Sequence, residues 1–177
     1  KSKFWDKKVL AFIQAREDSS RFPAKIYQDL NGAPVIYHVL SKAKESKFID
    51  EAVVLSPTKL SDLPVNTKEF ISLVSHPKSG YRDVLFEFYQ CLRLNPCDYV
   101  VRLTADCPML SPELIDCVIY HGIENNADYC SNVITLTFPD GVDTELVSSK
   151  MLKWLYDSVK SPYHREHVTS IIRDSKD

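Results

Sequence analysis

Glycine is scarce in this sequence, and its scarcity excludes two common phosphate-binding loops. Only four glycines occur in 177 residues, and the closest two, Gly122 and Gly141, are 19 positions apart. A P-loop requires two glycines five positions apart, and the dinucleotide-binding fingerprint requires three within six residues. Any phosphate binding by this chain must therefore rely more on side chains than on a glycine-rich cradle.

A strong net charge and long apolar runs are also missing. Lysine and arginine total 22, aspartate and glutamate total 24, and the formal net charge is −2. This balance does not indicate a general nucleic-acid or membrane binder. No apolar run approaches the roughly 18 residues of a membrane span. With 44% hydrophobic residues the chain can build a sizeable core, so we expect one domain over residues 1–177, without a nucleic-acid partner or a membrane span.

The cysteines form no recognisable metal or redox motif. No two of them have C-x-x-C spacing, which argues against a zinc knuckle or a thioredoxin-like site. Their number is odd and their positions are scattered: Cys91, Cys97, Cys107, Cys117 and Cys130. Free thiols of this kind suit a reducing compartment, so we expect a cytoplasmic protein.

Short apolar runs alternate with helical patterns along the chain, which predicts an α/β fold. The runs predict strands at 9–13, 52–55, 70–74, 99–103, 128–132 and 142–147. The helical patterns begin near 34, 83, 111, 149 and 161, and the first of them is opened by Asn31 to Pro34. The expected architecture is a three-layer sandwich around a mostly parallel, twisted sheet, whose ligands bind outside the carboxyl ends of the strands.

The loop after the first predicted strand is basic. Between Gln14 and Lys25 it contains three cations and two hydroxyls, namely Arg16, Arg21, Lys25, Ser19 and Ser20. Arginine offers a planar fork to phosphate oxygens, and lysine offers a compact charge, so a triphosphate would suit this loop. An ordinary solvated surface loop explains the same composition equally well.

The loop after the fourth predicted strand is acidic. Asp106 comes three residues after the end of the predicted strand, and the turn-forming Pro108 comes two residues later. A carboxylate at this place can hold Mg²⁺ while the metal keeps waters and substrate phosphates. A loop aspartate that merely caps a turn is the more common case.

The order of residues in these loops resembles the cytidylyltransferases that activate acidic sugars, the CMP-N-acetylneuraminate and CMP-Kdo synthetases and the spore-coat polysaccharide type. The pattern A-R-x-G-S-x-R-L-P-G-K is matched by Ala15, Arg16, Ser19, Arg21, Pro23 and Lys25, whereas Asp18 and Ala24 replace glycines and Phe22 replaces leucine. Asp18 places a negative charge beside the expected triphosphate. Residues 101–108 match every fixed position of V-R-x-T-x-D-C-P in the spore-coat branch.

Four further segments extend the resemblance over about 160 residues. They are 79–85, with glycine and serine in the reverse order of the family's pattern, 126–132, 138–145 and 165–169. The resemblance implies the architecture of nucleotide-diphospho-sugar transferases (GT-A-like). It also implies an enzyme that uses Mg²⁺ to transfer CMP from CTP to an acidic sugar, with release of pyrophosphate, for surface polysaccharide synthesis. Because better-known relatives are dimers, the resemblance further implies a homodimer.

The resemblance also implies roles for individual residues. The catalytic residues would be Arg16, Arg21, Lys25 and Asp106, with Asp106 as the Mg²⁺ ligand. The nucleotide would lie against Ala15, Arg16, Ser19, Ser20, Arg21, Lys25, Arg102 and Thr104. Asp143 and Glu145 lie two apart on a predicted strand and share a face, so either could bind the sugar or supply a second metal ligand. The sugar would also contact Arg165, Glu166 and His167.

Two other functions stay open from the sequence. The chain ends shortly after Arg165 to Thr169, and it shows no late acidic segment like that of the family, so we expect the domain to lack the family's C-terminal segment. A degenerate domain that binds nucleotide or a partner without turnover is therefore one alternative, and Asp18 favours it. A glycosyltransferase of similar architecture is the other, but the Asp-x-Asp motif expected for that class is absent. His164 and His167 resemble half a metal site, but a surface pair is the simpler explanation.

Overall fold

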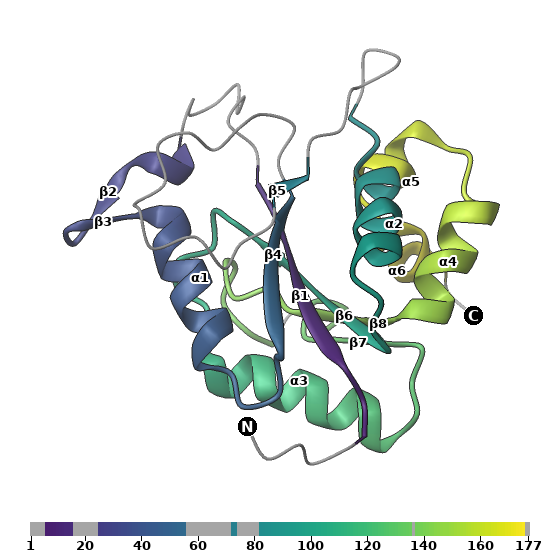
Figure 1. Cartoon of the computed structure of the whole chain (residues 1–177), viewed down its shortest axis with the longest axis horizontal. Helices are drawn as coiled ribbons and strands as arrows, with labels where there is room; N and C mark the ends of the chain where they lie inside the picture. Colours follow the sequence, from purple (N-terminus) through teal and green to yellow (C-terminus); the bar gives the residue numbers. More distant parts are fainter. Residues whose placement is uncertain (1–5, 16–24, 56–71, 74–81, 136, 176–177) are drawn as a thin grey trace.

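The computed structural model describes residues 6–15, 25–55, 72–73, 82–135 and 137–175. Within them, one sheet of six strands lies between two helical layers (Figure 1). The strand order is β5-β4-β1-β6-β8-β7. The bounds are Val9–Gln14 for β1, Glu51–Leu55 for β4, Ser72–Leu73 for β5, Tyr99–Thr104 for β6, Tyr129–Ser131 for β7 and Glu145–Ser148 for β8.

Four neighbouring strands of this sheet are parallel. Strand β1 pairs in parallel with β4 and β6, and β4 pairs in parallel with β5, whereas β8 is antiparallel to both β6 and β7. The mostly parallel α/β sheet that the sequence predicts is therefore confirmed. Because β1, β4 and β6 run in one direction, their carboxyl ends meet at one edge of the sheet.

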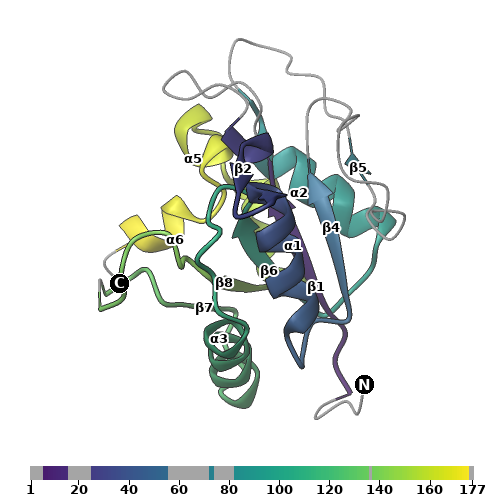
Figure 2. The ribbon, with the colours of Figure 1, turned by 90° about the vertical axis from the view of Figure 1, so that its left-hand side faces the viewer.

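The central strand β1 is buried on both faces, which explains why its sequence is an almost unbroken apolar run. Ala11 and Ile13 face one core, together with apolar side chains of α1 (Val35–Glu45) and α3 (Pro112–Glu124). Leu10 and Phe12 face a second core, formed with α2 (Val84–Leu94) and α4 (Ser149–Ser158). Figure 2 looks onto the first helical layer, with α1 in front of the sheet and α3 below it. The three-layer arrangement is confirmed.

The segment before α1 forms a hairpin instead of the predicted start of the helix. Strands β2 (Asp29–Leu30) and β3 (Ala33–Pro34) pair antiparallel across a two-residue turn. Both turn residues have positive φ, 53° at Asn31 and 86° at Gly32. That geometry favours the dipeptide Asn-Gly, which is itself a strong hairpin signal. Helix α1 therefore begins at Val35, after Pro34. A single helical turn, η1 (Lys25–Tyr27), precedes the hairpin.

The last predicted helix is divided into two. Helix α5 covers Pro162–Glu166 and α6 covers Ser170–Asp174. Between them Val168 has φ of 49°, a conformation that a β-branched residue rarely adopts. The break directs the Thr169 hydroxyl toward Glu145, to which it donates a hydrogen bond of 2.5 Å. Helical spacing alone could not reveal this interruption, because the apolar positions Val168, Ile171 and Ile172 keep helical spacing although the chain breaks at the first of them.

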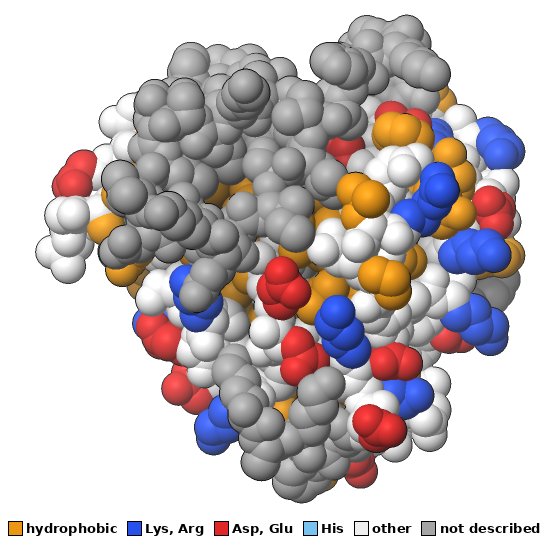
Figure 3. All heavy atoms as spheres, in the orientation of Figure 1, with side chains coloured by type: hydrophobic (Ala, Val, Ile, Leu, Met, Phe, Trp, Pro, Cys, Tyr) orange, Lys and Arg blue, Asp and Glu red, His pale blue; other side chains and the backbone are white. Residues whose placement is uncertain are grey.

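The face of the molecule shown in Figure 3 has lysine and arginine side chains interspersed with aspartate and glutamate among the residues that are described. This mixture agrees with the net charge of −2. No helix in the described part of the chain is both long and apolar enough to cross a membrane.

Candidate active site

Two of the predicted catalytic residues meet at the carboxyl edge of the sheet. The ammonium group of Lys25, in η1, lies 2.9 Å from Oδ2 of Asp106, in the loop after β6. Both side chains are partly exposed, 41% for Lys25 and 45% for Asp106. A cation and an anion that are 81 positions apart in sequence are thus paired where a ligand can reach both.

The backbone around this ion pair is fixed by the neighbouring strand ends. The Ala15 N–H donates to the Leu55 carbonyl at 2.8 Å, and the Ala105 N–H donates to the Gln14 carbonyl at 2.9 Å. Ala15 is fully buried. The Thr104 hydroxyl is 2.9 Å from the Cys107 sulfur, and this contact closes the turn that presents Asp106. The ends of β1 and β6 therefore form a rigid base below Lys25 and Asp106.

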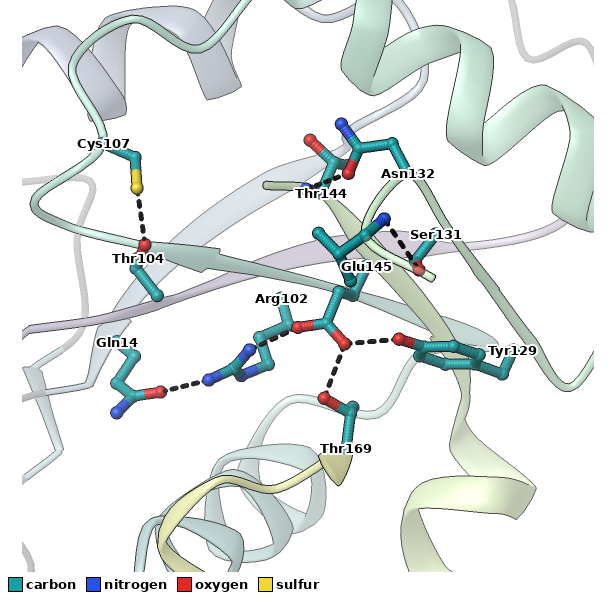
Figure 4. Close-up of polar contacts among 11 residues, drawn as sticks. Gln14, Arg102, Thr104, Cys107, Tyr129, Ser131, Asn132, Thr144, Glu145 and Thr169 are labelled. Carbon is teal, nitrogen blue, oxygen red and sulfur yellow. Dashed lines mark hydrogen bonds and ion pairs between the residues drawn. The ribbon is translucent and has the colours of Figure 1, made fainter. Parts of the chain in front are cut away.

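Glu145 is the buried centre of a group of polar side chains, which we call the Glu145 cluster: Glu145, Arg102, Gln14, Tyr129 and Thr169 (Figure 4). The Glu145 side chain is 2% exposed and that of Arg102 is 12% exposed, and the two form an ion pair. Tyr129 and Thr169 donate their hydroxyls to Oε2 of Glu145 at 2.6 and 2.5 Å. Arg102 also donates through Nη2 to Gln14 Oε1 at 3.1 Å.

The electrostatics of Glu145 follow from these partners. Burial alone would raise the pKa of Glu145, but the Arg102 guanidinium and the hydroxyls of Thr169 and Tyr129 outweigh it and hold that pKa below its ordinary value. Burial and the Glu145 charge raise the pKa of Tyr129, so its phenol stays a donor. Glu145 is an anion whose hydrogen-bonding capacity is largely used by protein groups.

Asp143 differs from Glu145 in both place and environment. Strand β8 begins at Glu145, so the prediction that Asp143 and Glu145 share a strand face is wrong. The backbone before β8 is instead bound by the Asn132 side chain, which accepts from the Thr144 N–H at 2.8 Å and donates to the Val142 carbonyl at 2.9 Å. Burial, Asp140 and Glu145 raise the pKa of Asp143. Burial also raises the pKa of the Cys107 thiol, and the Asp106 and Asp143 carboxylates act in the same direction.

The family model for cytidylyltransferases matches residues 10–176. The chain belongs to the cytidylyltransferase family. The chain is also 31% identical over 170 residues to the uncharacterized protein MJ1063 of Methanocaldococcus jannaschii, covering 95% of this chain and 68% of that protein. It is 27% identical over 180 residues to the spore coat polysaccharide biosynthesis protein SpsF of Bacillus subtilis, covering 94% and 70%.

Solved structures agree with this membership. A cytidylyltransferase from Leptospira borgpetersenii superposes on 96% of the chain with a TM-score of 0.82 and 26% identity, and 72% of that protein is covered. A CMP:2-keto-3-deoxy-manno-octonic acid synthetase superposes on 94% of the chain, and on 84% of its own length, with a TM-score of 0.70; at 16% identity it shows the fold alone. The chain spans about half, 46%, of the 3-deoxy-manno-octulosonate cytidylyltransferase of Anaeromyxobacter sp. strain K that it matches, at 32% identity over 111 residues.

Several of the predicted site residues lie outside the described residues. They are Arg16, Ser19, Ser20 and Arg21, together with Asp18. Lys25, Arg102, Thr104, Asp106 and Asp143 all lie near the ends of β1 and β6 or the start of β8. The structure thus brings these five predicted residues to one edge of the sheet.

The residues of the last motif serve the packing of helices. Arg165 donates to Asp83 Oδ2 at 2.8 Å and to the carbonyls of Tyr156 and Val159. The His167 ring packs against Tyr163, with 4.6 Å between ring centroids, and His164 contacts the Ser170 hydroxyl at 2.8 Å. Glu166 is the last residue of α5. The described contacts therefore place Arg165 between α5, α4 and the start of α2, and they give His164 and His167 partners within α5 and at the start of α6.

One buried arginine at this edge was not singled out from the sequence. Arg82 forms an ion pair with Glu87 at 2.5 Å and donates to the carbonyls of Ala15 at 2.7 Å and Leu55 at 3.4 Å. It thereby joins the ends of β1 and β4 to α2. The only available signal was an Arg-x-x-x-x-Glu spacing across a helix start, which is too common to interpret.

The chemistry of the site's carboxylates indicates which of them could hold a metal ion. The described residues contain no group of three histidine, cysteine, aspartate or glutamate side chains that could hold an ion. Mg²⁺, however, is commonly held by one or two carboxylates together with waters and substrate phosphates. Asp106 and Asp143 fit that requirement better than Glu145, whose oxygens already accept from Arg102, Tyr129 and Thr169.

Proposed function

We propose that this chain transfers the cytidylyl group of CTP to a hydroxyl of an acidic sugar of the nonulosonic type and releases pyrophosphate. The observation that supports this most is the Lys25–Asp106 ion pair at the carboxyl edge of β1 and β6, in a chain of the cytidylyltransferase family. Relatives named for 3-deoxy-manno-octulosonate and for spore coat polysaccharide support an acidic sugar and a role in surface polysaccharide synthesis.

The reaction is an in-line displacement at the α-phosphorus of CTP. The sugar hydroxyl oxygen forms a bond to this phosphorus, and the bond to the oxygen that bridges the α- and β-phosphates breaks. Pyrophosphate leaves with the electron pair, and the hydroxyl proton passes to solvent. No covalent intermediate with the protein is needed, so the protein must position both substrates and neutralise developing charge.

The charged residues at this edge have separate parts in the proposed reaction. The Lys25 ammonium would neutralise phosphate oxygens, aided by Arg16 and Arg21 in the preceding loop. Mg²⁺ would be held by Asp106, with Asp143 as a second carboxylate, and would supply charge neutralisation at the phosphates. When phosphates bind, Lys25 can exchange its partner from Asp106 to the ligand, because the pair is half-exposed and costs little to break.

The five cysteines are free thiols, which suits the cytoplasmic location that we also propose. A homodimer remains a prediction for which the sedimentation of the purified chain is the direct measurement.

The first test is calorimetric binding of CTP, UTP, GTP and ATP with and without Mg²⁺. Pyrophosphate release is then measured with CTP and either 3-deoxy-manno-octulosonate or N-acetylneuraminate. We expect Mg²⁺-dependent preference for CTP and release of pyrophosphate with at least one acidic sugar.

Three results would change the assignment. Tight CTP binding without pyrophosphate release from any acidic sugar would favour the non-catalytic binding domain. Preference for a nucleotide-sugar donor over CTP would favour a glycosyltransferase. If none of the four nucleotides binds, the proposal is wrong.

A further inference from the structure

Gln14 occupies a distinctive place beside the proposed site. It is the last residue of β1, its backbone pairs with Leu55 and Thr104, and the basic loop with Arg16 follows directly. Its side chain is partly exposed, unlike the other residues of β1. Gln14 therefore combines a rigid backbone with an accessible polar group at the edge where substrates are proposed to bind.

The orientation of the Gln14 amide is determined by its partner. Arg102 can only donate hydrogen bonds, so the group that faces its Nη2 at 3.1 Å must be the amide oxygen, Oε1. The amide nitrogen then points away from Arg102, as Figure 4 shows. Within the described part of the chain, Nε2 donates no hydrogen bond. The side chain thus offers only N–H donors to a ligand.

The rest of the Glu145 cluster holds Arg102 in that orientation. Glu145 pairs with Nη1, and Tyr129 and Thr169 fix the other carboxylate oxygen at 2.6 and 2.5 Å. The Arg102 Nε atom is buried and has no partner among the described residues. A buried ion pair with an unsatisfied donor is a poor way to stabilise a fold, because apolar residues of similar volume are often as good or better. This cost favours a role for the cluster beyond packing.

On the basis of the proposed function, we propose that Gln14 determines substrate specificity and that Glu145 is a positioning residue acting through Arg102. The Gln14 amide donates to a substrate group that only accepts hydrogen bonds. The carboxylate of an acidic sugar and the O2/N3 edge of cytosine both have this chemistry, whereas the N3–H of uracil does not. Glu145 keeps the amide oxygen occupied by Arg102 and so prevents the amide from rotating to present an acceptor.

The decisive variant is Gln14→Glu, which has nearly the same size. One oxygen of the new carboxylate can still accept from Arg102, but the second replaces an N–H donor by a negatively charged acceptor. Stability should therefore be preserved while the substrate contact becomes repulsive. Gln90→Glu, on α2, makes the same chemical change away from the site and is the matched control.

The measurements are the thermal midpoint, the calorimetric Kd for CTP and UTP with Mg²⁺, and the KM of the acidic sugar that gives turnover.

A Kd for CTP raised at least tenfold, with a smaller change for UTP, assigns the contact to the cytosine edge. An unchanged Kd for CTP, with the sugar KM raised at least tenfold and kcat changed less, assigns it to the sugar carboxylate. If the Kd for CTP and the sugar KM of Gln14→Glu both equal those of the Gln90→Glu control, the inference about Gln14 is wrong. In that case, turnover by the wild type would still support the proposed function. A wild type that neither binds CTP nor turns over overturns both.

A second pair of variants separates positioning from folding. Glu145→Gln leaves the Arg102 charge buried without an anion, so both the thermal midpoint and substrate affinity should fall. Adding Gln14→Glu returns an anion to Arg102. The double variant should therefore regain most of the lost thermal midpoint but not the substrate affinity. Recovery of both together would contradict the proposed Gln14 contact, and wild-type substrate affinity of Glu145→Gln at a temperature where this variant is folded would overturn the positioning role of Glu145.

Discussion

Arg165 and Asp83 join two distant motifs of the chain by a single hydrogen bond of 2.8 Å between Nε and Oδ2. The other oxygen of the same carboxylate caps α2, because Oδ1 accepts from the Phe86 N–H at 2.9 Å. The Arg165 guanidinium also lies over the Tyr156 ring, 5.2 Å from its centroid. Arg165 thus connects α5 with the start of α2 and the end of α4.

From this arrangement we predict that Arg165→Ala destabilises the fold. The substitution removes a charge-assisted hydrogen bond and leaves the cap of α2 without its second partner, at a cost of about 2 kcal/mol. Urea unfolding at neutral pH measures this difference. Lys42→Ala is the control, since it removes the Lys42–Glu45 pair on the surface of α1 and should cost no more than about 0.5 kcal/mol. An unchanged unfolding midpoint together with a raised sugar KM would instead support Arg165 as a substrate-binding residue.

The Lys25–Asp106 pair leads to a kinetic prediction. Lys25→Ala and Asp106→Asn should each lower kcat/KM for pyrophosphate release by about 10²-fold or more, because each removes a charge that acts on the phosphates. Both side chains are half-exposed, so unfolding midpoints should change little.

Steady-state pyrophosphate release measures the effect of these two variants. The controls are Lys153→Ala and Asp157→Asn, which make the same substitutions at exposed positions of α4. Wild-type rates in Lys25→Ala or in Asp106→Asn would remove that residue from the mechanism.

Glu145 leads to a prediction about acid stability. Its pKa is held below the ordinary value in the folded protein. The ionised carboxylate therefore contributes stability that is complete above the ordinary glutamate pKa of about 4.3 and is lost as the pH falls through the lower, folded value. The free energy of unfolding of the wild type should exceed that of Glu145→Gln at pH 6, and the difference should shrink below about pH 4.

Urea titrations of wild type and Glu145→Gln from pH 7 to pH 3 follow this difference. Glu113→Gln provides a comparison, since Glu113 is a surface residue of α3 whose pKa is lowered by hydrogen bonds, first from Ser111; its effect on stability should be small at every pH. A wild-type advantage over Glu145→Gln that does not depend on pH would contradict the predicted role of the charge.

The thiols should differ sharply in reactivity. Burial raises the pKa of Cys91 to about 12 and that of Cys97 to about 11, whereas Cys117 is exposed on α3. Because the thiolate is the reactive form, Cys117 should react first with Ellman's reagent and Cys91 only after unfolding. Labelling followed by peptide mass spectrometry identifies the order. Fast labelling of Cys91 in the native protein would contradict the close packing of α2 on the sheet.

Most elements of the fold could be predicted because their signals are local. The apolar run of β1 and the caps at Asp83 and Ser111 determine a strand and two helix starts within a few residues of sequence. The errors arose where a distant contact competed with a local pattern. Asn132 shortens β8 by binding the residues before it, and the positive φ of Val168 interrupts a continuous helical pattern.

In the candidate site, too, the sequence predicted the individual residues but not the contacts between distant ones. The order of residues in the two loops identified Lys25 and Asp106, and the parallel strands bring them together at one edge of the sheet. The same resemblance also selected Arg102 and Glu145, but it did not show that they pair with each other. Nor did it show which other side chains join them, namely Gln14, Tyr129 and Thr169. Such contacts depend on how β1, β6, β7, β8 and the turn before α6 lie relative to one another.

By itself, the sequence determined the alternation of strands and helices, the mostly parallel sheet and the chemical character of its carboxyl edge. These follow from hydrophobic periodicity and from the types of residue in each loop, which act over short distances along the chain. Only the tertiary structure decided which charges are paired, which are buried and which amide faces a ligand. Those properties depend on contacts between side chains of different strands, and short-range sequence patterns do not determine contacts between residues that are far apart in the sequence.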